Sequence, residues 1–269
     1  MAVITISEGS FSGGRMLAEA VSRRLGYQCI DREQVIAKAA QWGVSEQELH
    51  KTMEKPPSFF GQSPQTKYRY LAFIQAALTE QVRSGNAIYH GLAAHLLLGK
   101  GQHVLRVRII APLAFRVAML ELRQGLSRKE AVAYIERVDE ERRKWTRFLY
   151  GVDWTDPAIY DVVLNLEQMT LVDASDVICA LIASACFQTT PETYADLHNL
   201  ALASSVKAHL AMNSETSNLQ FEVAAENGSV SIKGEIDSPD QGKRVQSFVK
   251  TIAGVRAVAL NELSLVTRI

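Results

Sequence analysis

The hydrophobic positions of this chain fall into short blocks that alternate between strand-like and helix-like spacing. Nearly continuous apolar runs, typical of strands buried on both faces, lie at residues 2–7, 27–31, 87–91, 104–111 and 160–166. Helical spacing of apolar residues, or helix start and stop residues, separates these runs at 14–25, 32–42, 66–83, 112–125, 126–151 and 173–187. This alternation predicts an α/β fold with a five-stranded parallel sheet.

Beyond residue 187 the pattern changes. Residues 188–199 are polar and are predicted to form a linker, with a helix expected at about 197–212. Strands follow at 219–225 and 230–236, a helix at 238–252 and a final strand after residue 255. Asn227-Gly228 marks a hairpin between the first two strands. We therefore expect a first domain at 1–190 and a small α+β domain of αββαβ order at 197–269.

The predicted core of this small domain comes from residues that alternate in the strands and recur at helical spacing in the helices. It comprises Val206, Leu210, Phe221, Val223, Val230, Ile232, Val245, Phe248, Val249, Val255 and Val258.

Composition narrows the class of protein. The 269 residues are 47% hydrophobic and 22% charged, which is ordinary for a globular chain. The 29 basic and 29 acidic side chains give no net charge, so we expect no nucleic-acid partner. The three cysteines have no CxxC spacing and predict neither a disulfide framework nor a zinc site. Without a long apolar run or a signal sequence, we expect no transmembrane segment and a cytoplasmic location.

The stretch SEGSFSGGRML at 7–17 lies between the first predicted strand and the first predicted helix. Its Gly9-x4-Gly14-Arg15-Met16 spacing fits GxxxxGK[ST], with arginine for lysine and methionine for the hydroxyl residue. Backbone N–H groups at such a turn can cradle a phosphate, and Arg15 adds a cation. The predicted phosphate-binding residues are Gly9, Ser12, Gly13, Gly14 and Arg15. The alternative is a plain glycine-containing turn, and Met16 offers no magnesium ligand.

Two further features fall at the carboxyl ends of predicted strands, where open parallel sheets bind ligands. They are the Asp31-Arg32 pair and Gly91. His90 and His95 flank this glycine without nearby carboxylates in the sequence, so we interpret them as structural residues rather than metal ligands. We predict no protein-bound metal site.

Together these stretches resemble the cytidylate kinase-like family of P-loop kinases. The likeness spans about residues 1–185 and includes ITIS, SGGR, IDRE, VLRVRIIAPLAFRV and GLSRKEAVAYIERVDEERRKWTRFLYGVDWTDPAIYDVVLN. It implies a P-loop kinase fold with a helical lid. It also implies transfer of the ATP γ-phosphoryl group to a nucleoside monophosphate such as CMP, with Mg²⁺.

The resemblance assigns roles to residues at matching positions. Ser12 to Arg15 match the end of the family's loop, and Asp31, Arg32 and Gly91 match its acceptor side. Asp139 and Arg142 match the D-x-x-R of the lid, to which Arg143 and Arg147 add charge. Arg15 and Arg142 are the expected catalytic residues.

Some positions depart from the family. Phe11 replaces a glycine, which predicts crowding of the phosphate approach. Leu92 replaces an arginine that in related kinases helps to hold the acceptor, so we expect weak or absent CMP kinase activity. Glu8-Gly9 replaces Arg-Glu. The alternative function is therefore a kinase-derived nucleotide sensor that no longer turns over.

Structural alternatives also stand for single residues. Asp139 could form surface helix pairs with Arg142 and Arg143, three and four residues later. Asp31 could cap the helix that follows it.

Residues 197–265 resemble a BON domain in ASSVKAHL, GSVSIKGEI and IAGVRAV. The resemblance implies a small ligand or a phospholipid as partner of this segment, beside a nucleotide at the first domain. A homodimer is compatible with the sequence.

Overall fold

The computed structural model describes residues 2–54, 64–91, 94–99 and 104–265. The chain forms two compact units that interleave along the sequence. The first unit comprises Met1–Gln34, Met53–Pro56 and Ser84–Thr190. The second comprises Val35–Thr52, Pro57–Arg83 and Pro191–Ile269.

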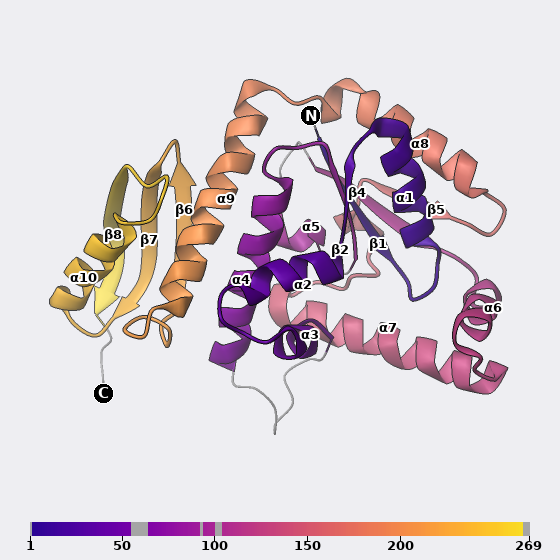
Figure 1. The fold of residues 1–269 in the computed structure, drawn as a ribbon, viewed down its shortest axis with the longest axis horizontal. Coiled ribbons are helices and arrows are strands. Elements are labelled where there is room, and N and C mark those ends of the chain that lie inside the picture. The colour runs from indigo at the N-terminus through magenta and orange to yellow at the C-terminus, as the bar shows by residue number, and fades with distance from the viewer. Residues whose placement is uncertain (1, 55–63, 92–93, 100–103, 266–269) are drawn as a thin grey trace. The chain divides into compact units, whose positions relative to one another are not determined.

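A parallel sheet of five strands forms the centre of the first unit, as predicted (Figure 1). Its strands are β1 (Val3–Glu8), β2 (Gln28–Asp31), β3 (Ala87–His90), β4 (Val104–Ile110) and β5 (Val162–Asn165), in the order β2-β3-β1-β4-β5. The central strand β1 pairs in parallel with β3 and β4 and is almost fully buried. Because all strands run the same way, their carboxyl ends meet at one edge.

Helices follow the strands as the alternating pattern predicts. They are α1 (Gly14–Leu25), α5 (Ala94–Leu97), α6 (Leu113–Gln124), α7 (Arg128–Tyr150) and α8 (Leu171–Ala183), with short 3-10 turns at Pro157–Ile159 and Ala185–Phe187. Helices α1 and α8 lie side by side (Figure 1), and Leu17 and Ile178 from them join one apolar core with Ile4 and Val107. Ser127 begins α7 with a capping box to Glu130.

The second unit holds a separate three-stranded sheet. Its elements are most of α2 (Arg32–Ala40), then α3 (Glu46–Glu54), α4 (Pro64–Val82), α9 (Pro191–Met212), β6 (Phe221–Glu226), β7 (Ser229–Ile236), α10 (Pro239–Val249) and β8 (Ala257–Leu265). Strands β6 and β7 are antiparallel, and β7 and β8 are parallel. The predicted αββαβ order is confirmed, and so is the hairpin, in which Asn227 and Gly228 both have positive φ.

The predicted core of the C-terminal segment is also confirmed. All eleven predicted residues belong to one cluster, seven of them buried and Val223, Phe248, Val255 and Val258 partly buried against it.

The predicted linker at 188–199 is wrong for most of its length. Helix α9 begins at Pro191 and runs without a break to Met212. Proline is tolerated in the first turn of a helix, where its missing N–H has no partner to lose. Leu197 and Ala201 are already buried on this helix, so its apolar face starts inside the predicted linker.

Helix α4 belongs to the same unit as the C-terminal segment. Trp42, after α2, stacks on Phe73 of α4 with ring centroids 5.6 Å apart. Its edge meets the His209 ring of α9 at 4.7 Å. The compact units therefore divide the chain differently from residues 1–190 and 197–269. The stretch KPPSFFGQSP at 55–64, whose prolines and glycine interrupt the helical pattern and predict an exposed excursion, lies, but for its last residue, outside the described residues.

Candidate functional site

The loop between β1 and α1 turns at Gly13 into the start of the helix. Gly13 precedes α1 with φ of 96°, in the left-handed region that favours glycine. Gly13 has no side chain that could cap α1, and no acidic residue lies in the first turn of this helix. Residues of the helix itself therefore do not offset the partial positive charge at the start of α1.

The carboxylate of Glu8 lies against this helix start. Gly14 N–H donates to Glu8 Oε2 at 2.6 Å. A Cβ at position 14 would lie 2.8 Å from Glu8 Cδ, so a larger residue here would require the Glu8 side chain to move. An anionic oxygen of the protein itself thus accepts from an N–H group of the loop that the sequence predicted to bind a phosphate. From the sequence, Glu8 was noted only as a departure from the family. An acidic residue at the end of a strand, six residues before a helix begins, could have indicated this contact with the helix start.

Helices α6 and α7 clamp the loop through a partly buried ion pair. Arg116 of α6 donates to Asp139 Oδ2 of α7 at 2.6 Å and to the Ser10 carbonyl at 2.7 Å. Asp139 Oδ1 accepts from Ser10 Oγ at 3.0 Å and from Ser10 N–H at 3.3 Å. Asp139 therefore fixes the loop instead of forming the surface pairs considered from the sequence. No local pattern in the sequence points to Arg116 as a loop contact.

Arg142 also binds the loop. It donates to the Glu8 carbonyl at 3.0 Å. Burial lowers the pKa of its guanidinium, an effect that the nearby Asp139 and Glu8 carboxylates oppose. Arg142, to which the resemblance assigns a lid role, thus lies beside the β1–α1 loop, on the same helix as Asp139.

Phe11 takes an uncommon backbone conformation, with φ of 63°. Its ring packs with the cluster of Val117, Leu120, Ala131 and Ile135 from α6 and α7, and it meets the Tyr134 ring at 6.2 Å. A left-handed φ is where a glycine would stand without strain, which agrees with the family's glycine at this position. The aromatic side chain instead ties the loop to the two helices.

A pocket of about 490 Å³ opens beside the loop. The predicted residues that line it are Gly13, Arg15, Asp31, Arg32, Gly91 and Arg142. It also holds Arg123, Glu8, Glu33 and His90, so four arginines face three carboxylates. Burial lowers the pKa of His90, although the Glu8 and Asp31 carboxylates oppose this shift. The structure therefore brings loop, acceptor-side and lid residues to one cavity. The predicted site residues that do not line it are Gly9, Ser12, Gly14, Asp139, Arg143 and Arg147.

Arg15 is on the surface of α1. Its Nε donates to Glu19 Oε1 at 2.9 Å, and 65% of the side chain is exposed. This hydrogen bond and charge pair raise the pKa of Arg15 and lower the pKa of Glu19. Exposed pairs of this kind contribute less than about 1 kcal/mol, so Arg15 can turn to an anion at small cost.

Asp31 has a structural role as well as a place in the pocket. Its Oδ1 accepts from Gln34 N–H at 2.8 Å, and its own N–H donates to Gln34 Oε1 at 3.0 Å. This reciprocal pair caps α2, as the structural alternative supposed. The same cap places Arg32 and Glu33 at the pocket wall.

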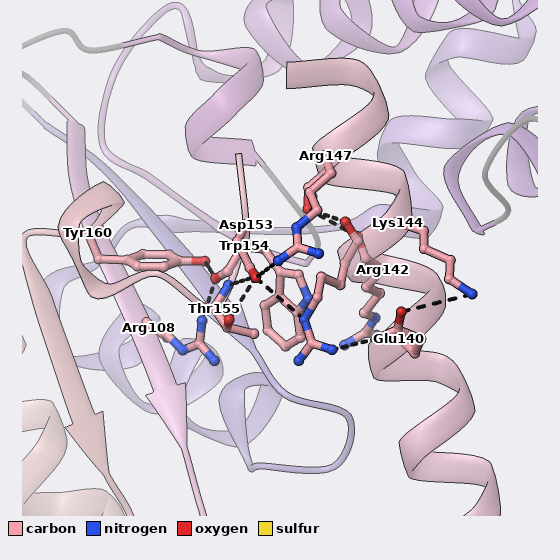
Figure 2. A network of polar contacts seen from close by, with 11 residues as sticks. Arg108, Glu140, Arg142, Lys144, Arg147, Asp153, Trp154, Thr155 and Tyr160 are labelled. Atoms are coloured by element: carbon pink, nitrogen blue, oxygen red, sulfur yellow. Dashed lines mark hydrogen bonds and ion pairs between the residues drawn. The ribbon is translucent and has the colours of Figure 1, made fainter. Parts of the chain in front are cut away.

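Arg143 and Arg147 lie together at Asp153, in the segment after α7. Arg147 Nη2 is 2.8 Å and Arg143 Nε 3.5 Å from Asp153 Oδ2 (Figure 2 shows the Arg147 contact). Burial alone would raise the pKa of Asp153, but hydrogen bonds from Thr155 and the two arginines lower it overall. These arginines hold the end of α7.

Arg108 of β4 is buried, with its guanidinium 4.6 Å from the Trp154 ring. It donates to the Trp154 carbonyl, which also accepts from Tyr160 Oη at 2.8 Å (Figure 2). The Arg108 guanidinium therefore contacts Trp154 and does not line the pocket. Leu92, on which the expectation of weak CMP turnover rests, lies outside the described residues.

Comparisons with known proteins place this arrangement in a family. Residues 3–168 match the model of the cytidylate kinase-like family, which is more than half of the chain. The chain belongs to the cytidylate kinase-like family. Residues 199–267 match the model of the BON domain. The P-loop kinase fold with a separate C-terminal α+β region, predicted from the sequence, is thereby confirmed.

Individual relatives agree with this assignment. A cytidylate kinase of Pyrococcus horikoshii is 25% identical over 167 residues, covering 62% of this chain and 80% of the relative. One of Ignicoccus hospitalis is 30% identical over 174 residues, covering 63% and 92%. The crystal structure of an uncharacterised protein from Eubacterium ventriosum shares the fold, with a TM-score of 0.55, 17% identity and coverage of 67% and 97%.

Across the described residues, no single helix is long and apolar enough to cross a membrane, and one pair of consecutive helices passes that test only when taken together.

Proposed function

We propose that the first unit binds ATP at the β1–α1 loop and transfers its γ-phosphoryl group to a nucleoside monophosphate such as CMP. The observation that carries this proposal is the 490 Å³ pocket, which Gly13, Asp31 and Arg142 line together. Membership of the cytidylate kinase-like family supports it, and so do the relatives named cytidylate kinase. The comparisons give no support to the alternative of a sensor without turnover.

The residues have separate parts in this proposal. The backbone N–H groups at the start of α1 bind the ATP phosphates, and the mobile Arg15 side chain adds charge from the exposed face of that helix. Arg142 neutralises the charge that develops on the transferred group. Phosphoryl transfer depends mainly on such positioning and charge stabilisation.

Magnesium enters as part of the substrate, bound to ATP. No group of three or more His, Cys, Asp or Glu side chains within the described segments could hold a metal ion. Met16, where the family of P-loops has a hydroxyl, supplies no oxygen. The residues present thus fit a phosphate but not a resident metal ion.

A phosphate at the loop must displace the Glu8 carboxylate, because both would accept from Gly14 N–H. This replaces one anion by another at the same helix start. The Arg142 bond to the Glu8 carbonyl involves the backbone and survives a rotation of the side chain.

Calorimetry with Mg·ATP and a coupled assay with CMP test the proposal. We expect ATP binding that weakens at least tenfold in Arg15→Ala. Arg142→Lys should lower kcat by at least 100-fold, while Arg137→Lys, an exposed variant on the same helix, leaves kcat unchanged. No heat and no thermal shift at millimolar ATP would overturn nucleotide binding.

The acceptor side needs its own assay. Because an apolar Leu92 cannot pair with a phosphate, we expect CMP turnover below the range of about 1–100 s⁻¹ common among kinases. Leu92→Arg should raise it. Wild-type turnover within that range would show that another cation, such as Arg32, holds the acceptor instead.

A further inference from the structure

The second unit contains a pocket of its own, with a volume of about 370 Å³. Its walls come from α4, from α9 and from the start of β6 with the loop before it, and Gly234 of β7 closes one side. Every lining residue belongs to the second unit. The α4 residues lie in the region matched to the kinase family, whereas the others lie in the region matched to the BON domain. Neither match alone contains this cavity.

Cations dominate the charge of this pocket. Arg69, Lys207 and Lys233 line it with a single carboxylate, that of Glu222. Arg69 Nε is buried and has no hydrogen-bond partner among the described residues. Burial lowers the pKa of Lys207, and the Glu222 carboxylate only partly opposes this effect. A buried donor without a partner costs roughly 1–3 kcal/mol, so an incoming acceptor would gain from meeting it.

The rest of the wall is largely apolar. Ala72 and Leu210 are buried, and Phe221 at the start of β6 is 6% exposed. The volume falls near the lower end of the roughly 300–1,000 Å³ of small-molecule sites, in which a few polar groups orient a mostly apolar ligand. The cavity therefore suits a compact molecule rather than a long chain.

We propose that this pocket binds a small organic anion, with its charged head at Arg69 and Lys207 and its apolar body against Leu210 and Phe221. The inference is independent of the proposed phosphoryl transfer, because none of these residues lines the pocket of the first unit.

Calorimetry on the full chain with hexyl phosphate tests the proposal. We expect binding at least tenfold tighter than that of inorganic phosphate, which lacks the apolar body, and no measurable binding of hexanol, which lacks the charge. Equal affinities for hexyl and inorganic phosphate would overturn the predicted apolar contact.

Variants then locate the site. Lys207→Met should weaken hexyl phosphate binding at least tenfold, and Glu222→Gln should strengthen it about threefold by removing a repelling charge. Lys243→Met is the matched control, because that side chain is 79% exposed on α10 and outside the pocket. Circular dichroism and thermal unfolding check that each variant is folded.

The same measurement distinguishes the pocket of the second unit from the proposed ATP site at the β1–α1 loop. Arg15→Ala should leave hexyl phosphate binding unchanged. Binding lost in Arg15→Ala and retained in Lys207→Met would place the anion at the β1–α1 loop and overturn the second site.

Discussion

At the residue scale, Glu8 determines how the phosphate loop meets an anion. Its carboxylate accepts from Gly14 N–H at 2.6 Å, so a phosphate and this side chain compete for one donor. The competition is both steric and electrostatic, because two anions at one helix start repel each other. If ATP binds at this loop as proposed, Glu8 sets a threshold for its binding that the glycine-rich sequence alone does not show.

Replacing Glu8 should tighten ATP binding. We expect Glu8→Gln to lower the Kd for Mg·ATP about three- to tenfold, and Glu8→Ala to lower it further, because the donor becomes free. Asp176→Asn is the control, because it removes an exposed carboxylate of the first unit that pairs with Arg24 and does not line the pocket. Calorimetry measures both. An unchanged or weaker affinity in Glu8→Ala would mean that the carboxylate organises the loop rather than blocking it.

His95 should make the stability of the first unit depend on pH. Burial, with the charges of Arg106 and Arg108, lowers the pKa of His95 to about 4. The folded state therefore resists protonation that the unfolded chain accepts at its ordinary pKa near 6.5. The contribution of His95 to the free energy of unfolding is therefore fully present above pH 6.5 and is lost as the pH drops toward 4. The loss from this group approaches about 3 kcal/mol.

Urea unfolding between pH 7.5 and pH 4.5 measures this effect. The His95→Gln variant should lose less unfolding free energy over that interval than the wild type, because it has no group to protonate. His50→Gln, on α3 of the second unit, should follow the wild type. Equal pH slopes in the wild type and His95→Gln would contradict the assignment.

At the scale of elements, α6 and α7 are positioned to hold the loop shut. The Arg116–Asp139 pair is only 13% and 20% exposed and contacts Ser10 from both sides. The resemblance implies that α7, which carries Asp139 and Arg142, is the lid of the fold. Any opening of this lid would have to break three contacts of α6 and α7 with the loop. They are the Arg116–Asp139 pair, the Arg142 hydrogen bond to the Glu8 carbonyl and the packing of Phe11.

Breaking the pair should destabilise the first unit. We expect Arg116→Met and Asp139→Asn each to lower the free energy of unfolding by about 2–4 kcal/mol, because each leaves a partly buried group without its partner. The double variant should lose less than the sum. Arg137→Met, which removes an exposed i,i+4 pair on α7, should cost less than about 0.5 kcal/mol. Strict additivity in urea unfolding would show that the two residues act separately.

Local patterns predicted this fold well, and long-range contacts explain what they missed. The strand, glycine loop and helix at 3–25 follow from adjacent residues, and so does the Asp31 cap. The Arg116 bond to Ser10 spans 106 residues and has no local signature. The polar stretch after Pro191 resembled a linker, because composition does not reveal a helix that buries one side, here beginning with Thr193 and Leu197.

At the scale of the whole molecule, the family boundaries and the compact units do not coincide. Helix α4 lies in the segment matched to the kinase family, yet it packs with α9 in the second unit. An amphipathic pattern shows that a helix buries a face and does not show against which partner. The sequence therefore predicted α4 correctly as a helix and gave no reason to expect this neighbour.

Trp42 tests whether α4 and the C-terminal segment unfold together. Trp42→Ala removes the stack on Phe73 and the edge contact with His209, at a cost of about 1–3 kcal/mol. We expect faster amide exchange in both α4 and β7. Phe148→Ala, at a side chain 45% exposed on α7, should change neither. Faster exchange confined to α4 would mean that the C-terminal strands form an independent unit.

The interleaving of the two units has a consequence during synthesis on the ribosome. Helix α4 ends at Val82, and its partner α9 begins at Pro191, about 110 residues later. At roughly 5–20 residues per second, the nascent chain must carry the apolar face of α4 for about 5–20 s before that partner exists. The first unit meanwhile completes its sheet with β5, at Asn165. Nascent chains stalled near residue 190 should therefore recruit chaperones at residues 64–82, and chains stalled beyond residue 212 should release them.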